Sequence, residues 1–354
     1  MFKIFKILIL CFLLQTKFVT GQDMHFTQFY ASPLYLNPAF TGANVCSRAA
    51  LVYRNQWPEV KNAYQSYLLS LDHFFTKQNL GIGLLCGVDN AGTGSLRTTI
   101  INPSIAYELK INKTLAVRFG FQPGVTIKSI RFNQLIFGDQ LARGGNSGPT
   151  SVATLETPTQ NKAFFDIGAG GLIYTSKYWA GASFFHINKP NESFLENEDV
   201  ILPMKYSVHG GAKFHVNEDE KDPDLKKSIS LVMNYKGQGE FDQVDVGFYY
   251  SQYLFTAGIW YRGIPGLKAY KPGYKNNDAV AIVLGFQKER LNIGYSYDIT
   301  ISQLQNLTQG AHEVTLSYQL CKPKKKTKRV LVSCPKFQVN FISFLIKNIT
   351  FILI

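Results

Sequence analysis

The chain has 354 residues, which is enough for one large all-β domain or two ordinary domains. Its formal net charge is +13, but residues 1–21 hold three lysines, residues 321–354 hold seven lysines and one arginine, and neither end holds an acid. Residues 22–320 therefore carry a formal charge of only +2, which argues against a basic face for nucleic acid.

The first 21 residues have the pattern of a secretory signal peptide. Lys3 and Lys6 precede an apolar run at 7–14, and small residues at 19–21 stand before a cleavage site ahead of Gln22. The run is too short to cross a membrane as a helix, which needs about 20 residues. We therefore predict export through the general secretory pathway, followed by cleavage.

Residues 22–46 form a distinct N-terminal segment. Within it, the stretch QFYASPLYLNPAFTGA at 28–43 is rich in aromatic residues, almost uncharged, and interrupted by Pro33 and Pro38. Its apolar side chains are unfavourable in water, and its prolines prevent regular pairing with lipid-facing strands. The segment therefore needs cover from the body that follows it.

Alternation of apolar and polar residues identifies that body. At 115–128 the odd positions are apolar, whereas the even positions are small or polar and include Arg118 and Gln122. This period of two continues for much longer than the roughly five or six residues of an average strand in a soluble protein. Strands of about ten residues are typical of a tilted membrane strand.

The chain holds fourteen candidate strands, and an even number is what a closed bacterial barrel requires. They lie at 47–57, 63–74, 80–88, 96–109, 115–128, 163–174, 178–187, 204–215, 228–236, 242–250, 254–262, 279–287, 291–301 and 311–320. We therefore predict an all-β fold, a transmembrane outer-membrane β-barrel of about fourteen antiparallel strands over 47–320.

The lengths of the connections alternate with strand number. Short turns follow even-numbered strands at 76–79, 110–114, 175–177, 251–253 and 288–290, and the charged connection at 217–227 is longer. The long loops follow odd-numbered strands at 129–162, 188–203 and 263–278. Because bacterial barrels have short periplasmic turns and long extracellular loops, we expect the N- and C-termini both in the periplasm.

A barrel offers the N-terminal segment a place to lie. We predict that the segment sits inside the barrel or against its periplasmic mouth as a plug or docking peptide; the alternative is a strap on the first strand. Glycines at 81, 83 and 87 share one strand face, which predicts a narrow lumen or a close backbone approach. The candidate residues for docking a partner or cargo are Phe29, Tyr30, Pro33, Tyr35, Asn37, Pro38 and Phe40.

No pattern of residues predicts a catalytic, cofactor or metal site. The six histidines are scattered, without an H-E-x-x-H pair, and neither G-x-S-x-G nor a phosphate-binding loop occurs. We therefore expect a protein that is not an enzyme and that needs no cofactor.

Residues 321–337 form a basic tail that follows the last strand. Its candidate docking residues are Lys322, Lys324, Lys325, Lys326, Lys328 and Arg329. This charge run is either a solvated end or a docking site for an acidic surface on a periplasmic partner. Residues 338–354 form an apolar extension that is too short for a spanning helix, and the sequence assigns it no function.

Six motifs occur in a characteristic order. They are QDMHFTQFYASPLYLNPAFTG at 22–42, YRNQWP at 53–58, FGDQ at 137–140, WYRG at 260–263, GYSYDITIS at 294–302 and GAHEVTLSY at 310–318. Together they resemble the PorP/SprF family of outer-membrane proteins of the type IX secretion and gliding machinery of Bacteroidota, from Gln22 to about Phe337.

The resemblance implies a barrel that helps to export surface adhesins bearing a C-terminal sorting domain and holds them at the surface. It implies partners among periplasmic ring subunits and peptidoglycan-binding lipoproteins, besides outer-membrane lipid. Similar cysteines close the family's tail, so Cys321 and Cys334 are candidates for a disulfide, with Cys46 as a competing partner. Residues 338–354 lie beyond the usual end of the family.

A diffusion porin or small-solute channel is the alternative function. We favour the secretion component over a porin because lumenal charges look sparse and the N-terminal segment could fill the lumen. An outer-membrane enzyme would need a group of catalytic residues that the sequence does not supply.

Overall fold

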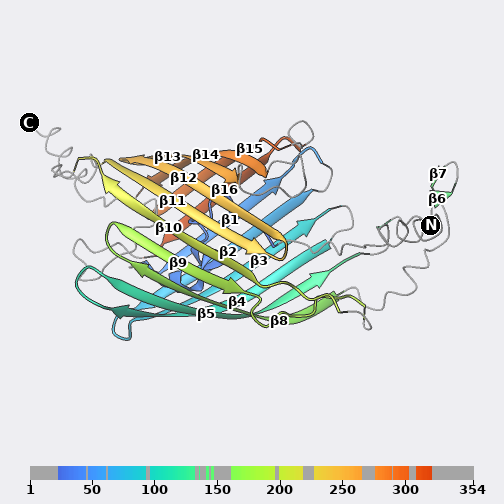
Figure 1. Cartoon of the computed structure of the whole chain (residues 1–354), viewed down its shortest axis with the longest axis horizontal. Coiled ribbons are helices and arrows are strands. Elements are labelled where there is room, and N and C mark those ends of the chain that lie inside the picture. Colours follow the sequence, from blue (N-terminus) through green and yellow to red (C-terminus); the bar gives the residue numbers. More distant parts are fainter. Residues whose placement is uncertain are drawn as a thin grey trace, which may run out of the picture.

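The protein is a closed β-barrel with an N-terminal segment inside it (Figure 1). The computed structural model describes residues 23–320, apart from 45–46, 61–62, 93–95, 132–134, 136–140, 143–144, 147–160, 196–198, 218–226, 265–275, 289 and 303–307. Within this part of the chain, fourteen strands form the barrel, and each pairs antiparallel with its two neighbours.

The barrel strands follow the chain in order around the wall. They are β1 (Arg48–Gln56), β2 (Tyr64–Phe75), β3 (Leu80–Ala91), β4 (Leu96–Lys110), β5 (Ala116–Ser129), β8 (Asn161–Tyr174), β9 (Tyr178–Phe185), β10 (Lys205–His215), β11 (Lys227–Gln238), β12 (Phe241–Gln252), β13 (Phe255–Gly263), β14 (Asn277–Lys288), β15 (Leu291–Thr300) and β16 (Ala311–Gln319). The barrel closes where β1 pairs with β16, in a register that joins Arg48 to Gln319.

The structure confirms the predicted fold class and all fourteen predicted strands. A two-residue hairpin that the sequence analysis did not predict, β6 (Leu141–Ala142) with β7 (Gly145–Asn146), lies in the long connection between β5 and β8. It is separate from the barrel sheet.

Side chains alternate between the lumen and the outer surface, as the period of two requires. In β5, Arg118, Gln122 and Thr126 are buried in the lumen, whereas Phe119 and Phe121 are exposed on the outside. The exposed residues of the other strands are also largely aliphatic or aromatic. This outer surface suits contact with lipid, because the backbone polar groups are paired within the barrel.

Aromatic pairs lie near both ends of the outer surface, as membrane barrels require at their two interfaces. Tyr53 lies 5.0 Å from Tyr67 between ring centroids toward one end of the barrel. Phe255 lies 5.5 Å from Phe286 at the other end. In the described part of the chain, no helix has the length and apolar character needed to cross a membrane.

The two ends of the barrel differ in their connections. We call one end the long-loop end, because it holds the connections 130–160, 186–204 and 264–276. We call the other end the short-turn end, because it holds the turns 76–79, 111–115 and 175–177. The predicted parity of loop lengths is confirmed. Which end faces outward follows from the general rule for bacterial barrels and remains a prediction.

Several predicted features lie outside the described residues. These are the signal peptide at 1–21, the basic tail with Lys322, Lys324, Lys325, Lys326, Lys328 and Arg329, the extension at 338–354, and the cysteines Cys46, Cys321 and Cys334. Within the described part, Cys86 is a free thiol and is half-buried.

Candidate functional site

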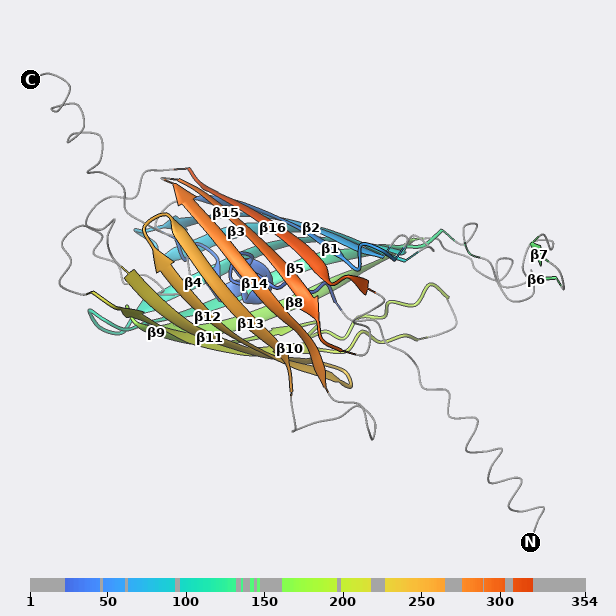
Figure 2. The same cartoon turned by 90° about the horizontal axis from the view of Figure 1, so that it is seen from above.

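Residues 23–44 lie inside the barrel and are called the lumenal segment. At the long-loop end, Lys205 Nζ donates a hydrogen bond to Asp23 Oδ2 at 2.7 Å. Near the short-turn end, Gly42 N donates to Asp72 Oδ2 at 3.0 Å. The segment therefore runs through the lumen from one end to the other, and its short helix is enclosed by strands (Figure 2). Of the two predicted positions, the lumen and the periplasmic mouth, the structure shows the lumen. The segment begins at the long-loop end, however, and not at the short-turn end where a periplasmic N-terminus was expected.

Both prolines of the segment begin helical turns. The helix α2 spans Pro33–Leu36, and the 3₁₀ helix η1 spans Pro38–Phe40. Proline is favourable at a first helical position, because its missing N–H would have no partner there. Between the two turns, Asn37 is extended, and its Oδ1 accepts a hydrogen bond from Ala39 N at 2.8 Å. The segment is thus divided into two compact turns instead of one helix.

Inward-facing glycines of the wall leave room for the backbone of these turns. A Cβ atom on Gly81 would lie 2.1 Å from Thr41 O, and one on Gly120 would lie 2.2 Å from Ala39 N. No other residue fits such a close backbone approach without displacing one of the two chains. The predicted role of the glycine face of β3 is confirmed at Gly81.

Arg118 of β5 binds the second turn of the segment through backbone carbonyls. Its Nε donates to Ala39 O at 2.8 Å, and its Nη2 donates to Thr41 O. Its Nη1 forms an ion pair with Glu108 Oε2 at 2.7 Å, and both side chains are fully buried. Because a buried guanidinium needs partners for its donors, the two carbonyls of the segment add to the partner that the wall supplies in Glu108.

Asn37 joins the segment to two strands on another side of the lumen. Its Nδ2 lies 3.0 Å from both Gly171 O of β8 and Ala182 O of β9, and donates to them. The same atom lies 3.2 Å from His209 Nε2 of β10. Asn37 is completely buried, so these contacts are shielded from water.

An aromatic cluster surrounds the middle of the segment. The ring centroids of Phe29 and Trp260 are 4.9 Å apart, and those of Tyr30 and Trp179 are 4.8 Å apart, both edge to face. Phe40 also packs against Trp179, at 6.2 Å. Such pairs each contribute about 0.5–1.5 kcal/mol beyond the burial of their area. The aromatic residues that made the sequence unusual are therefore matched by aromatics of the wall.

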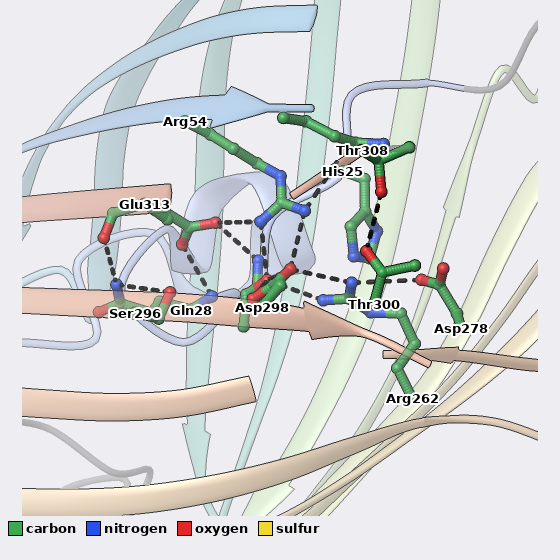
Figure 3. A network of polar contacts seen from close by, with 12 residues as sticks. His25, Gln28, Arg54, Arg262, Asp278, Ser296, Asp298, Thr300, Thr308 and Glu313 are labelled. Carbon is green, nitrogen blue, oxygen red and sulfur yellow. Dashed lines mark hydrogen bonds and ion pairs between the residues drawn. The ribbon is translucent and has the colours of Figure 1, made fainter. Parts of the chain in front are cut away.

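At the long-loop end the segment is held by carboxylates and guanidiniums. Glu313 of β16 accepts hydrogen bonds from Thr27 N at 2.7 Å and from Gln28 N at 2.8 Å, one on each carboxylate oxygen. Glu313 and Thr27 are 286 residues apart in the chain. Arg54 of β1 forms an ion pair with the same carboxylate at 3.2 Å (Figure 3).

The Thr27 hydroxyl lies at the centre of this network. It donates to Asp298 at 2.7 Å and accepts from Arg54 Nη1 at 2.8 Å and Arg262 Nη2 at 2.7 Å. Both arginines also form ion pairs with Asp298, at 2.9 and 3.0 Å. The hydroxyl uses its one donor and both acceptor positions, so the network satisfies it completely.

Asp23 and His186 form a second charged contact at this end. His186 Nε2 lies 2.9 Å from Asp23 Oδ2, and its Nδ1 lies 2.9 Å from Asp166 Oδ2. Burial opposes charge on the imidazole, but the two carboxylates raise the pKa of His186 to about 9. Burial likewise opposes charge on Asp23, but His186 and Lys205 hold the pKa of that carboxyl well below its usual range.

A family model for "Type IX secretion system membrane protein PorP/SprF" matches residues 19–318. This chain belongs to the PorP/SprF family. Membership agrees with the resemblance inferred from the motifs and establishes a non-enzymatic outer-membrane barrel of the type IX secretion system, with partners inside that machinery. In the part of the chain that is described, no group of His, Cys, Asp or Glu side chains could hold a metal ion.

This PorP/SprF protein has weak similarity to several proteins of known structure. No curated protein matches the chain. Omp33 of Acinetobacter baumannii is 5% identical, with a TM-score of 0.41, over 79% of this chain and 100% of that one. BamA of Haemophilus ducreyi, lacking POTRA domains 1–3, is 10% identical, with a TM-score of 0.39, over 77% and 69%. The KdgM porin is 8% identical, with a TM-score of 0.34, over 77% and 99%. Nothing about function follows from likenesses this weak.

The structure brings together the docking candidates of the N-terminal segment of this PorP/SprF protein, but it places them against the wall. Tyr35 is half-buried, and the other six are buried: Phe29, Tyr30, Pro33, Asn37, Pro38 and Phe40. Their proposed role in docking stays a prediction.

The wall residues that hold the segment were missed by sequence analysis. They are Arg54, Glu108, Arg118, Arg262, Asp298 and Glu313. Each is a charged residue at an inward position of a strand, so the alternation of side chains is the signal that could have found them. The expectation that lumenal charge is sparse is wrong, because these charges are numerous and neutralise one another in pairs.

Proposed function

We propose that this protein supports the export and surface attachment of adhesin-like cargo in the type IX secretion and gliding machinery, and does not act as an open diffusion porin. The observation that supports this proposal is the occupation of the lumen by residues 23–44, in contact with the wall from Asp23 to Gly42. A porin needs a continuous water-filled path, and buried aromatics fill the middle of this lumen.

A closed lumen fits a protein whose working surfaces are its two ends. The barrel anchors the protein in the outer membrane, while its loops and termini remain available to cargo and to periplasmic ring subunits or peptidoglycan-binding lipoproteins. The basic residues of the tail would then dock an acidic periplasmic surface. Replacing all six by Gln should weaken capture of such a partner, and added salt should weaken capture by the parent protein equally, because exposed charge contacts are screened.

Docking through the N-terminal aromatics requires a further step. Phe29 and Tyr30 contact Trp260 and Trp179 in the lumen, so a partner can reach them only after the segment leaves the barrel. We propose that contact with the machinery displaces the segment, and that the charged contacts at the long-loop end keep it in place beforehand.

Deletion of residues 24–41 tests the proposal. The barrel strands lie outside the deletion, so the variant should still show a heat-modifiable barrel on electrophoresis. In planar bilayers the parent protein should stay closed, and the variant should conduct steadily. In cells the variant should lose surface cargo. Steady conductance by the parent protein would favour the porin, and normal cargo display by the variant would show that the segment only fills space.

A further inference from the structure

A row of polar side chains crosses the outer surface of the barrel at the long-loop end. Strand register joins Gln65 of β2 to Asn90 of β3, Asn90 to Arg97 of β4, Arg97 to Ser129 of β5, and Ser129 to Asn161 of β8. All five side chains belong to the outward-facing set, because each follows the alternation of its strand. This row is called the polar row.

On the membrane side of the polar row, the outer surface is largely apolar. The adjacent outward row consists of Tyr67, Val88, Thr99 and Ile127, and the row after that consists of Leu69, Cys86, Ile101 and Val125. The outer surface therefore changes from apolar to polar within two rows. Such a change is expected at the level of lipid headgroups.

Four of the five residues of the polar row, all except Asn161, line a cavity on the outer surface. The cavity has a volume of about 340 Å³, and its lining includes Arg97, Arg131, Gln65, Asn90 and Ser129. No acidic side chain lines it among the described residues, and neither arginine has an ion pair or side-chain hydrogen bond there. Other arginines of this barrel, such as Arg54 and Arg262, are paired with carboxylates.

We infer that the polar row and Arg131 bind the phosphorylated sugar headgroup of an outer-leaflet glycolipid. Two guanidiniums can each bind a phosphate through two parallel hydrogen bonds, a geometry that arginine supplies and lysine does not. The amides of Gln65 and Asn90 and the hydroxyl of Ser129 offer donors and acceptors for sugar hydroxyls. The acyl chains would lie along the apolar rows below the headgroup.

This choice of ligand follows from the position of the cavity. A free anion could bind the arginines, but it would make no use of the apolar rows that continue from the cavity toward the membrane. A protein partner with acidic residues could also pair with the arginines. Its binding would not explain why the polar row lies at the level of the lipid headgroups. A phosphorylated glycolipid matches the charge, the polar donors and the apolar surface together.

The variant Arg97→Gln/Arg131→Gln tests the inference. The matched control is Lys288→Gln/Arg290→Gln, which removes two charges at the short-turn end. Each protein is placed in phosphatidylcholine nanodiscs with either phosphorylated or enzymatically dephosphorylated lipid A, and bound glycolipid is measured by native mass spectrometry after mild extraction. The parent and the control should retain the phosphorylated form. The Arg97→Gln/Arg131→Gln variant should retain it at least about tenfold less, which corresponds to about 1.4 kcal/mol.

Three results would overturn the inference: equal retention of the dephosphorylated glycolipid, displacement by millimolar inorganic phosphate, or unchanged retention by the Arg97→Gln/Arg131→Gln variant. A shift on heating in electrophoresis verifies that each variant is folded. Arg97→Lys/Arg131→Lys should retain an intermediate amount, since it keeps the charge but loses the paired hydrogen bonds. The inference rests on the long-loop end facing outward, and labelling of a cysteine placed within 147–155 on intact cells tests that orientation separately.

Discussion

The two halves of the lumenal segment are held in the barrel by different forces. Residues 23–28 at the long-loop end bind charged side chains of the wall, with Thr27 and Gln28 on Glu313 and Asp23 on His186. Residues 29–42 are held mainly by aromatic packing and by close backbone contacts with glycines such as Gly120. The last turn of this half also contacts charged side chains, those of Arg118 and Asp72.

This difference has a physical consequence. A buried network of charges is stable only as a whole, because the loss of one member leaves its partner charged and unpaired in a medium of low dielectric constant. Packing contacts do not depend on pH or salt in this way. A change in charge at the long-loop end should therefore release residues 23–28, whereas the aromatic middle of the segment can leave only after a change in packing.

The largest effect is expected from Arg262→Gln, which breaks the charged half. It leaves Asp298 and Asp245 without one of their cations, and loss of one buried partner costs about 3–5 kcal/mol. Hydrogen–deuterium exchange in micelles should rise on the order of a hundredfold or more in residues 23–28 and little in 37–42. Arg290→Gln, an exposed change at the short-turn end, serves as the control. Uniform loss of protection along the segment would show that the halves are not independent.

A smaller effect is expected from pH, again in the charged half alone. The pKa of His186 is raised from its ordinary value of 6.5 to about 9, so its contribution is complete below pH 6.5 and disappears as the pH rises through about 9. The shift corresponds to about 3 kcal/mol. Asp23 contributes above the ordinary pKa of an aspartate, near 3.8, and loses this contribution only in strong acid. The protection factors of residues 23–28, which compare each exchange rate with that of an unfolded chain at the same pH, should therefore be highest between about pH 4 and 6.5.

The variant His186→Gln identifies the group responsible for this pH dependence. This variant should no longer lose protection of residues 23–28 between pH 6.5 and 9. His215→Gln, at the short-turn end of β10, should lose protection as the parent protein does. A pH profile that is unchanged in His186→Gln would assign the titration to another group.

The smallest effect is expected from Gly120→Ala, which acts on the packed half. The added Cβ would lie 2.2 Å from Ala39 N, and overpacking of this kind costs about 1–3 kcal/mol. Exchange should rise in 37–42 and stay constant in 23–28, the opposite of the Arg262→Gln pattern. In Gly171→Ala the added Cβ would meet its nearest atoms at 4.0 Å, so this change should have no effect. Equal exchange in the two alanine variants would mean that the glycines do not limit the fit of the segment.

The sequence predicted the barrel well because its signals are local. Alternation at 115–128 places Arg118 inside and Phe119 outside without any knowledge of the neighbouring strands. The parity of loop lengths and the even number of strands are then those expected of a closed bacterial barrel. The aromatic and proline content of 28–43 likewise showed that this stretch needed cover, since its apolar residues cannot lie in water without a large loss of free energy.

Only the tertiary structure decided how the segment is held. The pairing of Thr27 with Glu313 joins positions 286 residues apart, and no local pattern links them. The choice depends on strand register and on closure of β16 against β1, which together set the height of each inward side chain in the lumen. For the same reason, only the register of β2 to β5 places Arg97 of the polar row beside the same cavity as Arg131. Sequence thus determined which side of the wall each residue faces, and the register of the closed barrel determined which charges meet.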